Sequence, residues 1–175
     1  MKTEIILSHD EIMAKVREIA AELDVEYADK NPIMVGIMKG SLYFLSDLTK
    51  EMSIPLQIDV MNLSSYGDSS KSSGVVKIVK DLDMDITNRH VVVLEDIVDT
   101  GTTLKYLKQY FMDKNAASVK TISIFQKEGT NVTDSTADRI GFTLPDYFLI
   151  GYGLDYAQNG RSFKDVHKVI SLDEN

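Results

Sequence analysis

Residues 91–103 read Val-Val-Val-Leu-Glu-Asp-Ile-Val-Asp-Thr-Gly-Thr-Thr, and they carry more structural information than any other stretch of the chain. The apolar run Val91–Leu94 predicts a buried strand. Glu95 and Asp96 follow it, and a loop of small residues from Asp99 leads into an amphipathic helix pattern. Loop amides and a helix N-terminus suit a phosphate, whereas carboxylates suit sugar hydroxyls or Mg²⁺. The stretch therefore predicts a strand, loop and helix that together bind a phosphate-bearing ligand.

Length and composition restrict the class of protein. With 175 residues, of which 43% are hydrophobic, the chain can bury one sizeable core, so we expect a single domain over residues 1–175. The absence of cysteine excludes disulfides and thiol chemistry. No signal-peptide pattern and no long apolar run are present, so we expect a cytoplasmic protein without membrane contact. A formal charge of −8 disfavours nonspecific binding to nucleic acid.

Strand and helix patterns alternate along the chain. Ser8 and Glu11 form a capping-box pattern that opens a helix over residues 9–28. Further helices are predicted over 42–51 and 103–113, and strands over 33–38, 56–63, 91–94 and 119–125. This alternation predicts an α/β fold with a parallel sheet and helices on both faces. Ligands bind at the carboxyl ends of such strands, where Lys39, the acids at 95–99 and Lys127 fall.

Residues 64–74 form a loop rich in serine and glycine. One interpretation is a flexible connection between two hairpin strands. The other is a lid that closes over a reactive intermediate and excludes water. Composition alone leaves both interpretations open.

The acidic run at 95–103 resembles the phosphoribosyl-pyrophosphate (PRPP) motif of type I phosphoribosyltransferases. Other stretches resemble the hypoxanthine-guanine branch of that family, in order along the chain: Val35–Ser41 its pyrophosphate loop, Ser65-Tyr66-Gly67 its lid, Lys127 its purine-recognising lysine, Phe148–Tyr156 its purine-stacking strand, and Arg161. The resemblance implies a parallel central sheet flanked by helices, a small hood formed by the N-terminal segment and residues 145–175, and a flexible lid. Residues 128–131 and 162–167 depart from the usual residues of the branch.

The resemblance implies a purine salvage reaction that requires Mg²⁺. The phosphoribosyl group of PRPP passes to hypoxanthine or guanine, which gives IMP or GMP and pyrophosphate. Asp99 would be the catalytic base for the purine N7 proton. The implied PRPP-binding residues are Lys39, Gly40, Ser65, Tyr66, Glu95, Asp96, Asp99, Thr100, Gly101, Thr102, Thr103 and Arg161.

The resemblance also implies a purine site, a metal site and an assembly. The implied purine-binding residues are Ile97, Lys127, Phe148, Leu149 and Asp155. The implied metal ligands are Glu95, Asp96 and Asp155, with Mg²⁺ bridging these acids and the polyanionic substrate. A cis peptide bond at Met38-Lys39 is a further implication. The family usually forms homodimers or homotetramers.

Three alternative functions remain. A transferase that prefers xanthine would use the same lysine, because xanthine also carries an oxygen at carbon six. A pyrimidine-directed transferase is a second alternative. A PRPP-sensing regulator of the same fold, without catalysis, is a third, and the acidic composition argues against the nucleic-acid binding that such a regulator would need.

Overall fold

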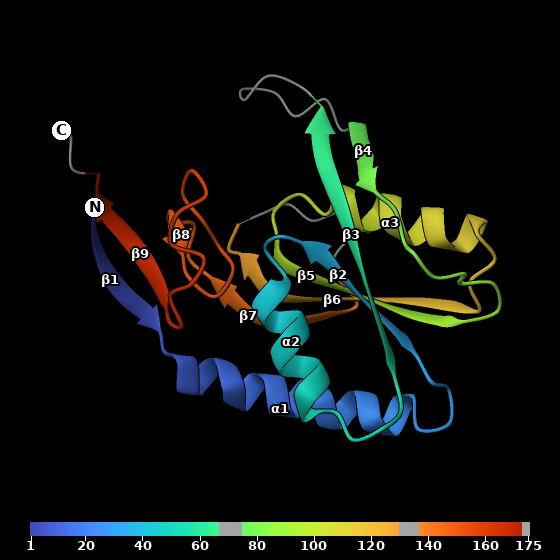
Figure 1. Ribbon diagram of the computed structural model, residues 1–175. Helices are drawn as coiled ribbons and strands as arrows, with labels where there is room; N and C mark the ends of the chain where they lie inside the picture. The colour runs from blue at the N-terminus through green and yellow to red at the C-terminus, as the bar shows by residue number, and fades with distance from the viewer. Residues whose placement is uncertain (67–74, 130–136, 173–175) are drawn as a thin grey trace.

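The computed structural model describes residues 1–66, 75–129 and 137–172, and within them a six-stranded sheet forms the centre of the molecule (Figure 1). Its strand order is β4-β3-β2-β5-β6-β7. Strands β2, β3, β5, β6 and β7 are parallel, and β4 is antiparallel to β3 at one edge. The strands are β2 (Ile33–Met38), β3 (Gln57–Tyr66), β4 (Val75–Lys80), β5 (His90–Val98), β6 (Ser118–Lys127) and β7 (Arg139–Leu144).

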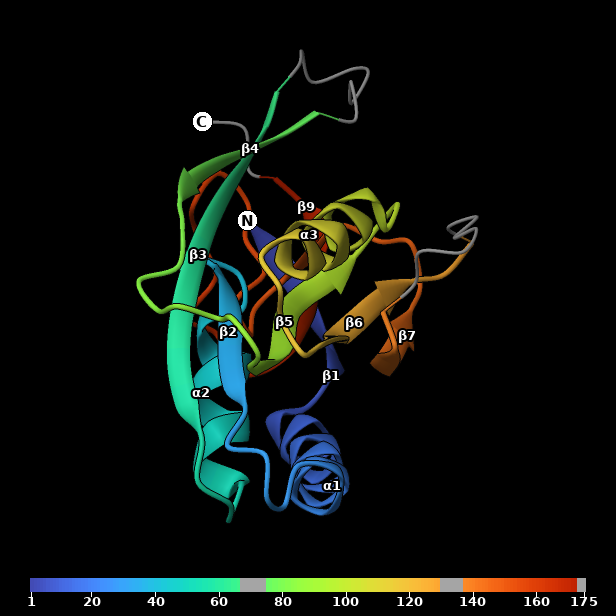
Figure 2. The same ribbon diagram turned by 90° about the vertical axis from the view of Figure 1, so that its right-hand side faces the viewer.

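Helices cover both faces of this sheet, as predicted. α1 (His9–Glu26) and α2 (Leu42–Glu51) pack on one face, and α3 (Thr102–Asp113) packs on the other (Figure 2). Ser8 and Glu11 form the predicted capping box at the start of α1. The helix ends at Glu26, two residues before the predicted end. None of the helices in the described ranges is both long enough and apolar enough to cross a membrane.

Segments near the two chain termini form a second, three-stranded antiparallel sheet. We call this sheet the hood, together with residues 151–165, which connect β8 to β9 and which we call the hood segment. The strand order of the sheet is β1-β9-β8, with β1 (Lys2–Leu7), β9 (Val166–Ser171) and β8 (Leu149–Ile150). Figure 1 shows the hood at one end of the central sheet. Two hydrogen bonds join it to the helices: the His9 amide donates to the Asp165 carboxylate at 2.7 Å, and the Tyr152 hydroxyl donates to the Asp47 carboxylate at 2.8 Å.

Several predicted boundaries were wrong. β5 does not end at Leu94 but continues through Glu95 and Asp96 to Val98, so these acids belong to the strand. Ser64, Ser65 and Tyr66 do not belong to a loop, because they continue β3 and pair with Lys77–Val75 of β4. The rest of the predicted lid, residues 67–74, lies outside the described residues. The strand expected over 148–156 ends at Ile150, because the next three residues have the positive φ angles of 100°, 49° and 99°, which an extended strand cannot contain.

Candidate active site

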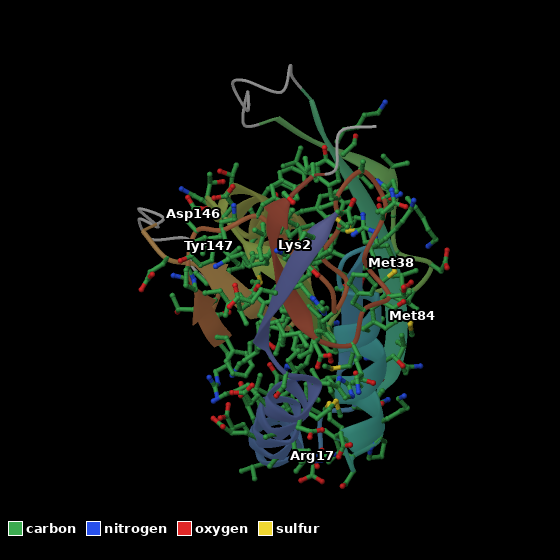
Figure 3. All side chains as sticks on the ribbon, turned by 90° about the vertical axis from the view of Figure 1, so that its left-hand side faces the viewer. Lys2, Arg17, Met38, Met84, Asp146 and Tyr147 are labelled. Carbon is green, nitrogen blue, oxygen red and sulfur yellow. The ribbon has the colours of Figure 1, made fainter. Side chains whose placement is uncertain are left out.

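Three adjoining cavities lie where the carboxyl ends of the central strands meet the hood segment. The first has a volume of about 310 Å³. Seven residues expected to bind substrate or metal line it: Lys39, Gly40, Glu95, Asp96, Thr103, Asp155 and Arg161. In Figure 3, which faces the hood, Met38 at the end of β2 and Tyr147 after β7 lie on either side of the hood strands. The candidate site therefore takes residues from both the central sheet and the hood.

Close backbone contacts hold the first cavity in shape. The Met38-Lys39 peptide bond is cis, as the resemblance implied. A Cβ added at Gly40 would lie 1.9 Å from Asp96 Oδ2. A Cβ added at Gly153 would lie 1.9 Å from the Gly40 carbonyl oxygen. The loop after β2 is thus sandwiched between β5 and the hood segment, with no room for a side chain at Gly40.

Asp155 and Arg161 form an ion pair on the hood side of this cavity. Arg161 Nη2 lies 2.8 Å from Asp155 Oδ1, and Arg161 Nη1 donates to the Gly153 carbonyl oxygen at 2.7 Å. The second carboxylate oxygen, Asp155 Oδ2, accepts from the Gln158 backbone amide at 2.8 Å. The sequence did not single out Gly153 or Gln158, because their roles depend on contacts with segments that are distant in sequence.

Two adjacent acids of β5, Glu95 and Asp96, form the floor of the cavity. Glu95 Oε2 is buried and has no hydrogen-bond partner among the described residues. Burial, together with the neighbouring Asp96 carboxylate, raises the pKa of Glu95 well above its usual range. Burial also raises the pKa of Asp96, against the opposing effect of the Ile97 amide, which donates to Asp96 Oδ1 at 2.8 Å. A cation bound beside these acids would offset the free-energy cost of burying their negative charge.

A magnesium ion fits this donor set. Mg²⁺ in phosphate-binding sites takes one or two carboxylates and fills its remaining positions with water and substrate oxygens. The unpaired oxygen of Glu95 and the adjacent Asp96 supply such carboxylates. No cluster of three or more acidic, histidine or cysteine ligands occurs among the described residues, so oxygens of substrate and water would complete the coordination. Asp155 lines the same cavity but is already bonded to Arg161 and Gln158.

The second cavity, of about 110 Å³, lies at the start of α3. Asp99, Thr100, Gly101 and Thr103 line it. Gly101 is the N-cap of α3 and has a φ of 77°, which favours glycine. The amides of a helix N-terminus attract an anion, so this cavity suits a phosphate.

The third cavity, of about 220 Å³, brings together all five residues expected to bind the purine. They are Ile97, Lys127, Phe148, Leu149 and Asp155. Phe148 is 52% exposed, and its ring packs edge-on with the Tyr156 ring at a centroid distance of 5.1 Å, so part of its surface is open to a base. Lys127 Nζ lies 3.1 Å from Asp146 Oδ1. Asp99, the expected catalytic base, lines the second cavity and is not among the described residues that line this third cavity.

The three cavities share lining residues and so form one continuous site. Glu95 and Thr103 line both the first and the second cavity. Asp96 and Asp155 line both the first and the third, and Ile97 lines both the second and the third. The backbone of Ser65 and Tyr66 lies at the end of β3, where the preceding Ser64 lines the first cavity. A ligand that carries a pyrophosphate and a ribose phosphate, together with a separate base beside it, could occupy all three.

The chain matches a known family of proteins over most of its length. The family profile described as "Phosphoribosyl transferase domain" matches residues 2–157, so the chain belongs to the phosphoribosyltransferase family. The hypoxanthine-guanine phosphoribosyltransferase of Bacillus subtilis (strain 168) is 44% identical over 158 residues, which cover 90% of this chain and 88% of that relative.

Solved structures agree with this assignment. A hypoxanthine phosphoribosyltransferase from Staphylococcus aureus matches with a TM-score of 0.90 and 36% identity, over 95% of this chain and 90% of that chain. A hypoxanthine-guanine phosphoribosyltransferase from Bacillus anthracis matches with a TM-score of 0.90 and 32% identity, over 95% and 98% respectively. The resemblance and the fold class predicted from the sequence are confirmed.

Proposed function

We propose that the protein catalyses the transfer of the 5-phosphoribosyl group from PRPP to hypoxanthine or guanine, with Mg²⁺, in purine salvage. The products are IMP or GMP and pyrophosphate. The bond between the anomeric carbon and the pyrophosphate oxygen breaks, and a bond from that carbon to the purine N9 forms. Curated relatives at 44% identity carry the name of this activity.

The observation that carries the proposal is the order of the three continuous cavities. The phosphate cavity at α3, the cavity with Lys39 and Arg161, and the cavity with Phe148 and Lys127 meet at Glu95, Asp96 and Ile97. The two substrates have the same arrangement: the 5′-phosphate and the pyrophosphate of PRPP extend from the ribose in different directions, and the acceptor base approaches the ribose from a third. The ribose would therefore lie over the β5 acids, whose carboxylates accept from its hydroxyls.

Two cations, one from the loop after β2 and one from the hood segment, would stabilise the departing pyrophosphate. The Lys39 ammonium and the Arg161 guanidinium supply positive charge where negative charge develops as the glycosidic bond breaks. When bound, Mg²⁺ would neutralise further charge on the diphosphate and screen it from the acids. Glu95 and Asp96 would hold this ion, while Asp155 orients Arg161 through its ion pair.

Asp99 and Lys127 would control the purine. Asp99 would accept the N7 proton as N9 attacks, with the base reaching toward the phosphate loop past Ile97, which lines both cavities. Lys127 would donate to the oxygen at carbon six. Adenine has an amino donor there, which would leave the buried donors of both partners unmatched. Ser65 and Tyr66 would complete a lid that excludes water from the electrophilic sugar.

A base panel tests this function. The purified protein is given Mg²⁺, PRPP and, in turn, hypoxanthine, guanine, xanthine, adenine and uracil, and the nucleotide products are separated. We expect IMP, GMP or both, and no product with adenine or uracil. A xanthine preference would correct the substrate, and failure with every six-oxopurine would refute the proposal. Salt-dependent RNA or DNA binding without turnover would instead support a regulator.

We further infer that the protein is cytoplasmic and forms a homodimer or homotetramer with one domain per chain. Its proposed substrate PRPP is a highly charged metabolite that does not cross membranes. Apolar residues of the hood are exposed, among them Ile5, Ile170 and Leu172, each at 47% or more. Light scattering after size exclusion measures the assembly, and a single cooperative unfolding transition supports one domain.

A further inference from the structure

A tight turn in the hood segment carries an unusual backbone conformation. Tyr156 and Asn159 exchange two backbone hydrogen bonds, of 2.9 Å and 2.8 Å. The two residues between them, Ala157 and Gln158, have φ angles of 47° and 68°. Turns of this kind require positive φ at both central positions and favour Asn-Gly there. Ala and Gln adopt this conformation at an energetic cost, which contacts elsewhere in the structure must offset.

The Gln158 side chain reaches the charged residues of the first cavity. Its Oε1 accepts a hydrogen bond from Lys39 Nζ at 3.4 Å and another from Arg161 Nη2 at 3.3 Å. Its backbone amide donates to Asp155 Oδ2 at 2.8 Å. Lys39 belongs to the loop after β2 and lies 119 positions away in sequence. One residue therefore touches three charged groups that the candidate site brings together.

We propose that Gln158 is a positioning residue that holds the Lys39 ammonium and the Arg161 guanidinium side by side through one neutral oxygen. The inference rests on the proposed function, because the two cations are taken to bind the pyrophosphate of PRPP. Gln158 itself touches no reacting atom. It sets the separation and direction of the cations before the substrate arrives.

The neutrality of this side chain matters for the electrostatics. Two cations repel each other, so an acceptor between them lowers the free energy of holding them close. A carboxylate would do the same but would also cancel their charge, and the cavity already contains Glu95, Asp96 and Asp155. An amide oxygen attracts both donors and leaves their net charge available to an anion. The cations are thereby preorganised for a diphosphate.

The positive φ at Gln158 follows from the same role. A left-handed residue at the second central position of the turn directs the side chain back over Asp155 and Arg161, whose contacts are described above. Glycine would suit the backbone better but has no side chain to place there. Ala157, the other left-handed residue, has no side-chain polar atom, so it offers a matched control for the turn conformation.

The test compares Gln158→Ala and Gln158→Glu with the control Ala157→Gly. For each purified variant, kcat, the KM for PRPP, the KM for hypoxanthine, the inhibition constant of pyrophosphate and the melting temperature are measured. In Gln158→Ala we expect the KM for PRPP and the inhibition constant of pyrophosphate to rise roughly tenfold, because two hydrogen bonds to charged groups are lost. We expect the KM for hypoxanthine to change less than about twofold.

The other two variants separate charge and turn effects. Gln158→Glu should also raise the KM for PRPP, since its carboxylate pairs with both cations and cancels their charge. Ala157→Gly should leave the kinetic constants unchanged and raise the melting temperature by about 2–4 °C, because glycine relieves the positive φ. This combination would distinguish cation placement from a general loosening of the turn.

Specific outcomes would overturn the inference. A KM for PRPP in Gln158→Ala within twofold of the wild type would show that the amide does not position the cations. Equal increases in the KM values for both substrates, with a lowered melting temperature, would show a purely structural role. In either case a wild-type protein that forms IMP leaves the proposed function intact, whereas a wild type that forms no nucleotide refutes the function itself.

Discussion

Single residues at the candidate site are held in place by contacts with almost no free space. The Gly40 position is one of the tightest of these, because an added Cβ would lie 1.9 Å from an oxygen of Asp96. Real Cβ atoms do not approach a neighbour so closely, so the loop or the acid must move. Either movement would change the geometry of the carboxylate that we assign to the ribose and to Mg²⁺.

Gly40→Ala should therefore abolish most activity without unfolding the protein. We expect kcat/KM for IMP formation to fall about 100-fold, as displacements of about 1 Å at a reacting centre do. The far-ultraviolet circular dichroism spectrum should stay unchanged. Gly129→Ala is the control for the backbone effect of losing a glycine, because Gly129 has a φ of 76°, which disfavours a side chain, while no described atom lies within 4 Å of the added Cβ. Activity of Gly40→Ala close to that of Gly129→Ala would contradict the assigned role of this loop.

Lys127 should determine the preference for an oxygen at carbon six. Lys127→Ala removes the donor that binds the carbon-six oxygen of hypoxanthine. It also removes the donor that opposes the amino group of adenine at the same position. The ratio of kcat/KM for hypoxanthine to that for adenine should fall by about 100-fold. Lys30→Ala, at an exposed position outside the three cavities, serves as the control. Unchanged selectivity would remove Lys127 from purine recognition.

Glu95 should make the ligand-free protein less stable as the pH rises. Its pKa is raised above the usual 4.5 by burial and by Asp96, so the folded state binds this proton more tightly than the unfolded state does. The contribution to the free energy of unfolding is therefore greatest below pH 4.5, falls as the pH rises through the raised pKa, and stays low above it.

Glu95→Gln removes this titration. In EDTA and without substrate, the variant should gain stability relative to the wild type as the pH rises above 4.5. Urea unfolding at a series of pH values measures the difference. A difference between variant and wild type that does not change with pH would mean that Glu95 titrates normally in the folded protein.

At the scale of elements, one carboxylate joins the hood to the first helix. Asp165 lies in the segment before β9, and its Oδ1 accepts from the His9 amide in the first turn of α1 at 2.7 Å. The first amides of a helix have no partner within the helix, and a carboxylate also complements the helix dipole. This contact adds to the capping box of Ser8 and Glu11 at the same end.

Asp165→Ala should therefore destabilise the protein by about 1–2 kcal/mol. Urea denaturation with an unchanged m-value would measure this loss. Asp165→Asn keeps an acceptor oxygen but not the charge, so its loss should be smaller. Equal stability of Asp165→Ala and the wild type would show that the bond to α1 contributes nothing measurable.

At the scale of the whole molecule, the candidate site joins the two sheets. Lys39, Glu95 and Asp96 come from the central sheet and its loops, whereas Asp155 and Arg161 come from the hood segment. A ligand that contacts all of them is bound only when both parts are folded and docked. Binding therefore contributes to the stability of the whole arrangement.

PRPP with Mg²⁺ should accordingly raise the melting temperature. At a concentration about 100 times the Kd, the free energy of unfolding rises by about 2.7 kcal/mol, which corresponds to about 5–10 °C for a chain of this size. Removing Mg²⁺ with EDTA should abolish most of the shift, because PRPP would then meet the β5 acids unscreened. Ribose 5-phosphate with Mg²⁺ should give a smaller shift. An equal shift with and without Mg²⁺ would contradict the metal assignment.

Local chemistry allowed much of the fold to be predicted. The capping box fixed the start of α1, and the apolar run 33–38 and the helix 42–51 have the predicted bounds. The five residues expected to bind the purine do line one cavity. These features depend on residues near one another in sequence, or on the ordered motifs through which the chain resembles its family.

Other features depend on contacts between segments that are distant in sequence, and these contacts form only when the chain folds. β3 runs on to Tyr66 because β4 supplies a pairing partner, and β8 ends at Ile150 because the next residues turn to pack against the Gly40 loop and Asp165. Gln158 meets Lys39 across 119 positions of sequence. No local pattern encodes such an approach.

The amino-acid sequence by itself determined the alternation of strands and helices, the adjacent acids before a glycine-containing turn, and the family, because periodicity, caps and motifs are local properties. Only the tertiary structure decided which charged side chains of the candidate site form ion pairs and which do not. Asp155 forms an ion pair with Arg161, whereas Glu95 has a buried oxygen with no hydrogen-bond partner in the part of the chain that the structure describes. The physical reason is that burial and pairing depend on distances between segments, and these distances arise only when the hood packs on the central sheet.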